Sequence, residues 1–422
     1  MTITAPAKRF LLLIAFAFFL FANLPLPFAV LPGGTRAFAW LALFWRAVVP
    51  VAAERLFHVH AALPEAWNDS VDTTFSYVQY AVWALVSLII ALAASPLLRD
   101  ERRYERTSRW FFIYLRYALA VAMIRYGVAK VSGNQFPLPS LDTLVEPFGS
   151  ASPMGLAWMF MGTSRWFKLF AGAVEMIGGV LLTLRRTALL GALLVIGVMS
   201  NVAAMNICYG VPVKTYALQL LLMACIIALP HRHRLADLFL RNRTAAPEPV
   251  APLFARGSVQ SAALVLRTLF VVYVVIQAAR SEARWRRQEG ELAPRSPLRG
   301  IWRVDQLTDN GIDRPPLITD ERRWRRIVFD GPVFMSIFDM ADRRSSFRAT
   351  LDPAARVAHL VLDDDPRETL DLIYQRPQPD TLVVDTVVEG RRLHALCHRE
   401  DERAFPLTSR GIHWVDERPF FQ

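Results

Sequence analysis

Lysine and cysteine are both scarce in this sequence. Only four of its 48 basic residues are lysines, and its three cysteines, Cys208, Cys225 and Cys397, are scattered. Because only Cys397 lies in the charged C-terminal part, a disulfide framework is excluded there, and no CxxC redox pair exists. The chain also lacks the sequence fingerprints of serine hydrolases, zinc proteases and nucleotide-binding proteins. The motifs therefore name no catalytic residue, and whether the chain is an enzyme is left open.

Apolar residues, in contrast, make up 54% of the 422 residues, and they concentrate before residue 281. From there on the sequence is charged and strand-like, so a membrane part is expected to precede a soluble part. The formal net charge of +11 would suit a nucleic-acid partner, but the arginines flank apolar segments instead of forming one recognition element. We therefore expect the lipid bilayer, and no nucleic acid, as the partner of these basic residues.

Seven segments come close to the roughly 20 apolar residues that a membrane span requires. They are residues 9–31, 73–98, 109–131, 165–184, 187–208, 212–230 and 259–280. The first has too long an apolar core for a cleavable signal peptide, so we expect it to be retained. The stretch 38–53 is interrupted by Arg46 and Pro50, which favours a re-entrant or interfacial helix over a further span. Residues 243–252 read as a flexible connector.

Loop charge predicts the orientation of these helices. Arginine-rich loops at 99–109, 185–186 and 231–243 fall on one side, which the positive-inside rule assigns to the cytoplasm of a bacterial inner membrane. The arginine-poor loops 132–164 and 209–211 then face outward. After the seventh helix the chain leaves on the outer side, so the C-terminal domain is expected to be periplasmic. Four arginines between positions 280 and 287 count against this, but three consistent loops outweigh them.

The outer half of the predicted bundle collects polar residues, and no comparable cluster is expected in the inner half. Lys130 ends the third helix, and Arg125 lies roughly 7–8 Å deeper at about 1.5 Å per residue. Glu175, near the middle of the fourth helix, needs a cationic partner, for which Arg125 and Lys130 are the candidates. The predicted pocket residues are Arg125, Tyr126, Lys130, Glu175, Asn201, Asn206 and Lys214.

This predicted pocket should be net positive and open to the outer side, since Lys168 and Lys214 add two further cations. It should favour an anion or a carbonyl-bearing headgroup. In the alternative interpretation, Lys168 and Lys214 only reach the membrane interface, and the asparagines only join helices.

Three segments of this region carry a family resemblance. They read IRYGVAKVSGNQF, FKLFAGAVEMIGGVLLTLRRTALLGALL and NVAAMNICYGVPVK, and together they resemble the core of the DoxX family of small bacterial membrane proteins over about residues 108–235. On this match Lys130, Glu175 and Lys214 occupy motif positions. The resemblance implies a four-helix membrane core, associated with quinone-linked sulfur oxidation or with redox-stress complexes. This chain departs from the family by its added helices and its soluble domain.

From Leu298 the sequence reads as short strands separated by turns such as DDDP and RPQPD. The opening Gly300-x-Trp302 is similar to the start of a lipocalin, so an up-and-down barrel and a β-sandwich are both considered. The expected fold is thus an α-helical polytopic membrane bundle followed by an all-β domain. The expected domains are 1–107 with the N-terminal helices and a periplasmic loop, 108–235 with the four-helix core, 236–291 with a linker and the seventh helix, and 292–422 with the β domain.

Histidines with ligand-like spacing occur at His58-x-His60 near Glu54, and at His394 with His398. Neither pair has a third ligand in register, so no metal is expected. Two classes of function remain. The first is a membrane redox component whose outer polar cluster binds a quinone headgroup, which would be its cofactor, or a small anion, and which works with a periplasmic or membrane redox partner. The second is a non-catalytic scaffold whose β domain holds a periplasmic partner or a lipid.

Overall fold

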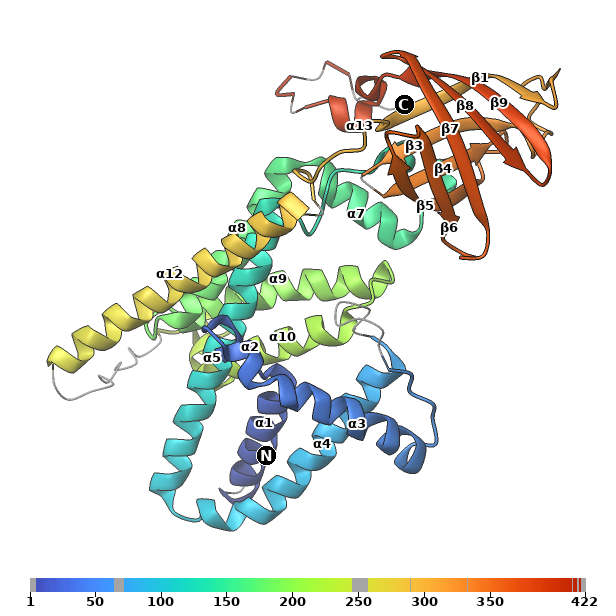
Figure 1. Ribbon diagram of the computed structural model, residues 1–422. Helices are drawn as coiled ribbons and strands as arrows, with labels where there is room; N and C mark the ends of the chain where they lie inside the picture. Colours follow the sequence, from blue (N-terminus) through green and yellow to red (C-terminus); the bar gives the residue numbers. More distant parts are fainter. Residues whose placement is uncertain are drawn as a thin grey trace. The chain divides into compact units, whose positions relative to one another are not determined.

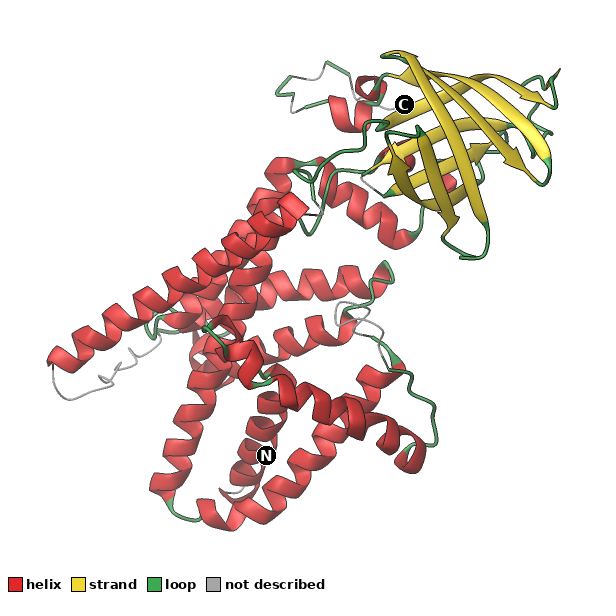
Figure 2. Ribbon diagram, in the orientation of Figure 1, coloured by secondary structure: helices red, strands yellow, loops and turns green. Residues whose placement is uncertain are grey.

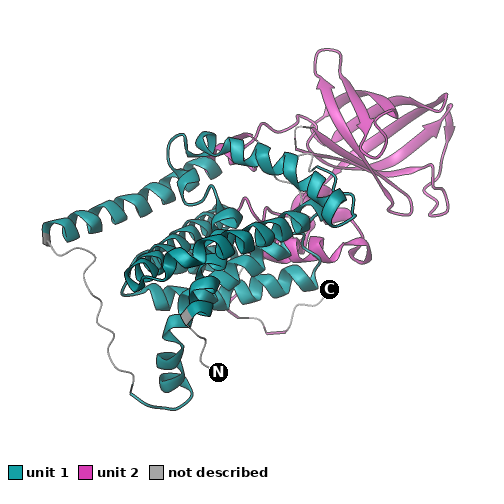
Figure 3. Ribbon diagram, turned by 90° about the horizontal axis from the view of Figure 1, so that it is seen from below, with its two compact units in different colours: residues 1–132, 166–282 teal, residues 133–165, 283–422 magenta. Residues whose placement is uncertain are grey.

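The chain folds into two compact units in the computed structural model, which describes residues 5–63, 72–244, 257–288, 290–331, 333–411, 413–415 and 417–418 (Figure 3). The first, called the membrane unit, comprises residues 1–132 and 166–282. The second, called the barrel unit, comprises residues 133–165 and 283–422. The chain therefore enters the barrel unit twice. Most of the predicted connector 243–252 lies outside the described residues.

The membrane unit is helical (Figure 2). In the described part of the chain, seven helices are long and apolar enough to cross a membrane. They are α1 (Ala5–Asn23), α4 (Thr74–Ala94), α5 (Glu101–Ser132), α8 (Arg165–Thr183), α9 (Ala188–Cys208), α10 (Lys214–Ala228) and α12 (Gly257–Gln288). Each coincides with one of the seven segments predicted from the sequence, so the prediction of a polytopic helical bundle is confirmed.

Shorter helices connect these spans. They are η1 (Phe28–Val30), α2 (Gly34–Ala37), α3 (Ala39–Leu56), η2 (Ser95–Leu98), η4 (Leu229–His231) and α11 (Arg232–Phe239). The stretch predicted to be re-entrant or interfacial is α3, and Pro50 lies inside this helix instead of interrupting it. Its Trp45 packs against Trp83 of α4, with ring centroids 6.0 Å apart. Since α3 is not among the seven spanning helices, its re-entrant or interfacial placement stays a prediction.

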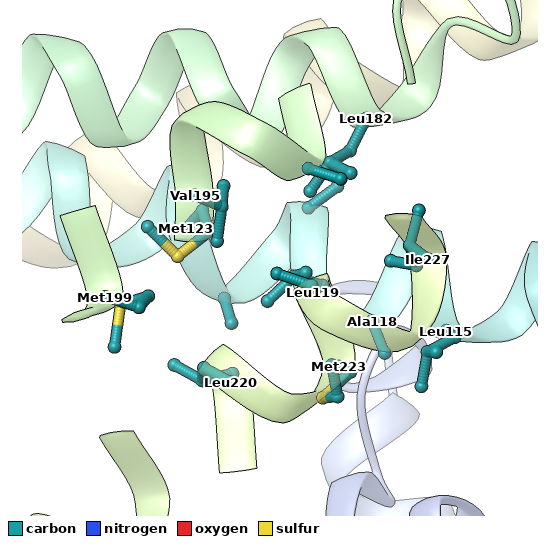
Figure 4. Packing of buried hydrophobic residues seen from close by; sticks show 14 of the residues in the cluster. Leu115, Ala118, Leu119, Met123, Leu182, Val195, Met199, Leu220, Met223 and Ile227 are labelled. Atoms are coloured by element: carbon teal, nitrogen blue, oxygen red, sulfur yellow. The ribbon is translucent and has the colours of Figure 1, made fainter. Parts of the chain in front are cut away.

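The α5 helix lies at the centre of the membrane unit. Its Leu119 and Met123 pack against Val195 of α9 and against Leu220 and Met223 of α10, and all five side chains are buried (Figure 4). Lipid tails are as apolar as these side chains, so close packing, more than exclusion of water, holds the helices together.

Two polar contacts show which helix ends share a side. Arg9, near the start of α1, forms an ion pair of 3.2 Å with Glu101 at the start of α5. Asp72, just before α4, accepts hydrogen bonds from the backbone N–H groups of Lys214 and Thr215 at the start of α10. The alternating order of spans predicted from loop charge places the same ends together.

The barrel unit contains a closed antiparallel barrel (Figure 1). Its eight strands are β1 (Gly300–Asp309), β3 (Trp324–Asp330), β4 (Phe334–Asp339), β5 (Arg344–Asp352), β6 (Val357–Leu362), β7 (Thr369–Gln378), β8 (Thr381–Val388) and β9 (Arg391–Glu400). Each strand pairs with its neighbour in this order, and β9 pairs with β1 to close the barrel. The two-residue β2 (Ile312–Asp313) only extends the end of β1 as a hairpin. Of the two folds considered for this domain, the up-and-down barrel is confirmed and the β-sandwich is wrong.

The barrel interior is filled by its own side chains. Leu393, Ala395 and Cys397 alternate along β9 and point into the core. Trp302 of the predicted G-x-W is also fully buried, and its indole N–H donates to the carbonyl oxygen of Leu298 at 2.8 Å. A barrel of eight strands is just wide enough for side chains to fill. Burial raises the pKa of the Cys397 thiol to about 12, so this cysteine is a protonated core residue.

A segment from the helical half of the sequence covers part of the outer face of the barrel. It forms α6 (Leu141–Val145), whose Leu141 packs against Val328 and Phe338. The backbone N–H of Leu141 also donates to Oδ2 of Asp330 at 2.8 Å. The helix is thus fixed to the barrel by an apolar contact and by a hydrogen bond.

An ion pair of 2.8 Å between Asp142 and Arg344 adds a third contact between this segment and the barrel. The segment continues with η3 (Phe148–Ser150) and α7 (Pro153–Thr163), and η5 (Glu402–Ala404) and α13 (Pro406–Ser409) follow β9. The predicted β domain, 292–422, is therefore part of a larger unit that includes the predicted outer loop. Because this unit is one compact body, the loop and the barrel lie on the same side of the membrane.

Candidate functional site

A buried ion pair joins α5 and α8. The ammonium of Lys130 lies 2.8 Å from Oε1 and 2.9 Å from Oε2 of Glu175, and the two residues are only 5% and 2% exposed. Of the two candidate partners for Glu175, the structure selects Lys130. The same ammonium lies 5.7 Å from the centre of the Tyr126 ring, within the range of a cation–π contact. The pair is therefore an internal and well-compensated part of the bundle.

Glycines allow α5 and α8 to approach closely enough for this pair to form. A Cβ atom on Gly127 would lie 2.6 Å from the carbonyl oxygen of Gly172, and a Cβ atom on Gly172 would lie equally close to the carbonyl oxygen of Gly127. Two turns along α8, a Cβ atom on Gly179 would lie 2.8 Å from another carbonyl oxygen of α5. A larger side chain at any of these positions would force the helices apart.

A cavity of about 270 Å³ shares Tyr126 with this ion pair. Its polar lining residues are Arg125, Tyr126, Tyr216, Ser281 and Glu282, and its apolar lining residues are Leu26, Ala122, Ala129 and Ala278. The rings of Tyr126 and Tyr216 lie 6.1 Å apart. Within the described chain, Arg125 has no hydrogen-bond or ion-pair partner. The cavity thus combines one arginine, one carboxyl group, two phenol groups, a serine and mostly small apolar side chains. Because its lining has one basic and one acidic side chain, the expected excess of positive charge is not found.

Lys214 lies at the outer end of α10, where Asp72 holds it. The Asp72 carboxylate accepts the N–H of Lys214 at 2.7 Å and the N–H of Thr215 at 3.0 Å, and the Lys214 ammonium lies 3.5 Å away. Although burial favours the protonated acid, the hydrogen bonds from Thr215 and Lys214 hold the pKa of Asp72 below its usual value. The carboxylate also complements the positive end of the α10 dipole. Lys214 therefore takes part in a contact between the starts of α4 and α10, and it does not line the cavity.

The remaining polar residues of the predicted cluster also lie elsewhere. Asn206 is buried and donates to the carbonyl oxygen of Val213 at 3.4 Å, which links the end of α9 to the turn before α10. Asn201 is exposed on α9, and Lys168 is buried on α8. Of the seven predicted pocket residues, Arg125 and Tyr126 line the cavity. Lys130 and Glu175 adjoin it through Tyr126, and the other three do not contribute to it.

A buried polar network between α1, α4 and α10 was not predicted. The Tyr80 hydroxyl donates to Oε1 of Gln219 at 2.6 Å, and the Gln219 amide donates to Oδ1 of Asn23 at 3.1 Å. The Asn23 amide in turn donates to the carbonyl oxygen of Phe19 at 2.8 Å. A single polar residue in an apolar run, as in LQLLL around Gln219, is the signal that the sequence offers. It does not reveal the partner.

The expectation that the inner half of the bundle holds no comparable polar cluster is wrong. Arg116, in the inner half of α5, donates from Nε to the carbonyl oxygen of Leu182 at 2.9 Å. Arg267 of α12 lies near it, as does Arg185 of the turn after α8. The sequence shows that Arg116 lies inside an apolar run, but only the packing of the helices brings these cations together.

On the barrel, His394 and His398 lie on the outer face and Cys397 points inward, as the alternation of a strand predicts. Nδ1 of His394 lies 2.7 Å from Asp385, and His398 pairs with Asp305. In the described residues, no group of three His, Cys, Asp or Glu side chains could hold a metal ion. The pairs are therefore cross-strand contacts on the barrel surface.

Seven spans and a closed eight-stranded barrel define a multi-pass helical membrane protein that carries a β domain. Over 126 residues, the chain is 31% identical to the uncharacterized protein YwoB of Bacillus subtilis (strain 168), and the match covers 29% of this chain and 79% of that protein. Through this stretch the chain belongs to the same family as YwoB. No family model matches the chain, and no solved structure matches it.

Proposed function

We propose that this chain is a DoxX-like component of a quinone-linked redox system in a bacterial inner membrane, and that the cavity around Arg125 binds the quinone headgroup. The observation that carries the proposal is the cation without a partner in the described chain, beside two tyrosines. Arg125 lies roughly 7–8 Å inside Lys130 at the outer end of α5. Charged side chains within a bilayer usually face the bundle interior or an aqueous cavity and pair with an acceptor, so a ligand that accepts hydrogen bonds from Arg125 is expected.

The lining of the cavity suits a flat ring that bears carbonyl groups. Arg125 and the hydroxyls of Tyr126 and Tyr216 are hydrogen-bond donors, and quinone oxygens are acceptors. The small side chains of Ala122 and Ala129 leave space for the faces of the ring. At about 270 Å³ the cavity lies just below the usual ligand-site range of about 300–1,000 Å³. This size suits a headgroup whose apolar tail extends into the lipid.

The neighbouring ion pair supports the same conclusion. Because Lys130 and Glu175 compensate each other at 2.8 Å, the pair adds no net charge next to the cavity. Arg125 is then the cation that a ligand meets. The pair also holds Tyr126 in place, since the Lys130 ammonium lies over the ring of that residue.

We further propose that the barrel lies in the periplasm. The barrel unit includes residues 133–165, so the barrel follows this loop to whichever side the loop faces. The positive-inside rule assigns the arginine-rich loop 99–109, at the other end of α5, to the cytoplasm. The loop 133–165 and the barrel are then outside.

Retention of quinone by the purified protein tests the proposed site. Full-length protein in a mild detergent should release quinone on organic extraction, as detected by mass spectrometry. Arg125→Met should retain at least about tenfold less, because a hydrogen bond to a charged group contributes about 1.5–3 kcal/mol. Arg109→Met removes an exposed cation from the inner end of the same helix and should retain the wild-type amount. Equal retention in Arg125→Met, with an unchanged helical spectrum, would contradict the proposal.

A scaffold function is the second candidate, and the packing of the barrel favours one form of it. Because side chains fill the barrel interior, a partner would bind the outer face and not the lumen. The part of this face around Val328 and Phe338 is already covered by α6. A protein that copurifies with the chain, in the absence of quinone, would favour this second function.

A further inference from the structure

A cluster of three arginines lies at the inner end of the bundle, on α5, on the turn after α8 and on α12. Arg116 lies sixteen residues before the outer end of α5, or about 24 Å along the helix. The hydrocarbon core is about 30 Å thick, so this level is near the inner interface. Arg185 and Arg267 lie close enough to Arg116 to repel its charge.

The contacts between helices confirm that this corner is packed. Arg116 donates from Nε to the carbonyl oxygen of Leu182, in the last turn of α8, at 2.9 Å. The rings of Tyr117 on α5 and Phe270 on α12 lie 5.8 Å apart, which brings the two helices together at this level. The helices that carry Arg116 and Arg267 are therefore packed together at this level, and α8, which Arg116 contacts, leads into the turn that carries Arg185.

Two nitrogen atoms of the cluster are buried without a hydrogen-bond partner in the described chain. They are Nη2 of Arg116 and Nε of Arg267. An unsatisfied buried donor costs about 1–3 kcal/mol, and more when its group is charged. The carbonyl of Leu182 satisfies one donor of Arg116 but neutralises no charge. The corner thus combines like charges with unused donors, and an anion that accepts several hydrogen bonds would relieve both costs.

We propose that Arg116, Arg185 and Arg267 bind a phosphate group, either that of an anionic phospholipid headgroup or a free phosphate. The planar guanidinium presents its donors in a fork that matches the oxygens of phosphate. Basic pockets between helices on the cytoplasmic side are recurrent sites for anionic headgroups. Arg116 and Arg267 are both half-buried, so each side chain keeps an accessible part that a headgroup can reach from the surface of the bundle. This site is separate from the cavity around Arg125, which lies nine residues further along α5.

Native mass spectrometry of the full-length chain in detergent tests this site. The protein should bind one molecule of phosphatidylglycerol in preference to phosphatidylcholine, which has no net charge. Arg267→Gln should weaken this binding by about tenfold or more, as expected for the loss of a charged hydrogen-bond donor. Arg186→Gln makes the same charge change at the neighbouring position of the turn, and it should leave the affinity within about twofold of wild type.

A competition with inorganic phosphate distinguishes the two sources of the group. Displacement of the lipid by millimolar phosphate would assign the site to a free phosphate, and persistence of the lipid would assign it to the headgroup. Arg116→Lys keeps the positive charge but loses the planar, forked set of donors of the guanidinium. This variant should still fold, and it should bind phosphatidylglycerol more weakly than the wild type does. Unchanged phosphatidylglycerol affinity in both Arg267→Gln and Arg116→Lys would overturn the proposal, as would an equal loss in Arg186→Gln.

Discussion

At the scale of single residues, the environment of Lys130 explains why a chain with so few lysines has one there. One nitrogen lies within 2.9 Å of both oxygens of Glu175, between helices that Gly127 and Gly172 bring into backbone contact. A guanidinium is a wide plane, whereas an ammonium is a compact point charge. The small residues that bring α5 and α8 together thus also favour the smaller cation.

The Lys130–Glu175 pair gives a prediction about stability. Glu175→Gln is expected to lower the free energy of unfolding by about 3–5 kcal/mol, because it leaves a buried ammonium unpaired. Adding Lys130→Met should recover part of this loss, since the unpaired charge disappears. Thermal unfolding of the full-length protein in detergent measures both effects.

The matched control for this pair is Lys214→Met. Its partner contact, with Asp72 at 3.5 Å, involves a partly exposed lysine, so its loss should cost about 1 kcal/mol or less. Strictly additive effects of Glu175→Gln and Lys130→Met would show that these two side chains do not interact.

Asp330 gives a prediction about pH. Burial raises the pKa of this carboxyl above its usual value, and the hydrogen bond from Leu141 offsets only part of the shift. The folded state therefore binds the proton more tightly than the unfolded state does. The stability of the barrel should fall as the pH rises from about 4 through the folded-state pKa. Asp330→Asn should lack this fall.

Urea unfolding at a series of pH values checks this prediction. The exposure of Cys397 to a disulfide reagent that is active in acid reports on opening of the barrel, because the thiol is buried in its core. Cys208 and Cys225 are replaced by serine, so that a single thiol reacts. Identical pH profiles for Asp330→Asn and its parent would show that Asp330 titrates as an ordinary carboxylate.

At the scale of helices and strands, the sequence predicts the spans well because a run of about 20 apolar residues is a long and distinctive signal. The alternation of β9 likewise places Cys397 inside the barrel. The sequence does not predict α6, because Leu141–Val145 is only five residues long. Its apolar face becomes recognisable only once it is packed against β3 and β4. In the same way, the sequence narrows the partner of Glu175 to two cations, and only the packing of α5 on α8 decides between them.

The docking of α6 gives a prediction at this scale. Residues 292–422 alone should fold with a strand-dominated spectrum, because the barrel core lies within these residues. Joining residues 133–165 through a flexible linker should raise the melting temperature. Leu141→Asp should abolish the gain, since it buries a charge against Val328 and Phe338. Leu138→Asp, at a position that is 54% exposed, is the control. A helical or random spectrum for the barrel alone would refute the prediction.

At the scale of the whole molecule, loop charge predicts the alternating order of the spans, and the contacts of Arg9 with Glu101 and of Asp72 with Lys214 agree with it. It does not predict that residues 133–165 belong to the same compact unit as the barrel, because that unit joins segments more than a hundred residues apart. No local pattern encodes such a contact.

Reporter fusions test the proposed topology. A fusion after Arg243 should report a cytoplasmic location, and a fusion after Gln422 should report a periplasmic one. A membrane-impermeant thiol reagent should label Ser150→Cys from the same side as the second fusion, since η3 belongs to the barrel unit. The same location for both fusions would remove α12 as a span and place the barrel in the cytoplasm.

The contact between α6 and the barrel also sets an order of events during biosynthesis. Leu141 leaves the ribosome before Gly300, by an interval of roughly 10–30 seconds at typical rates of about 5–20 residues per second. Throughout this interval the apolar face of α6 has nothing to cover. The barrel itself cannot close until β9, its last strand, has been synthesised, because β9 pairs with β1. A nascent chain of this protein therefore presents one half of this contact before the other exists, and assembly of the barrel unit ends when the late strands close beside a segment that was synthesised long before them.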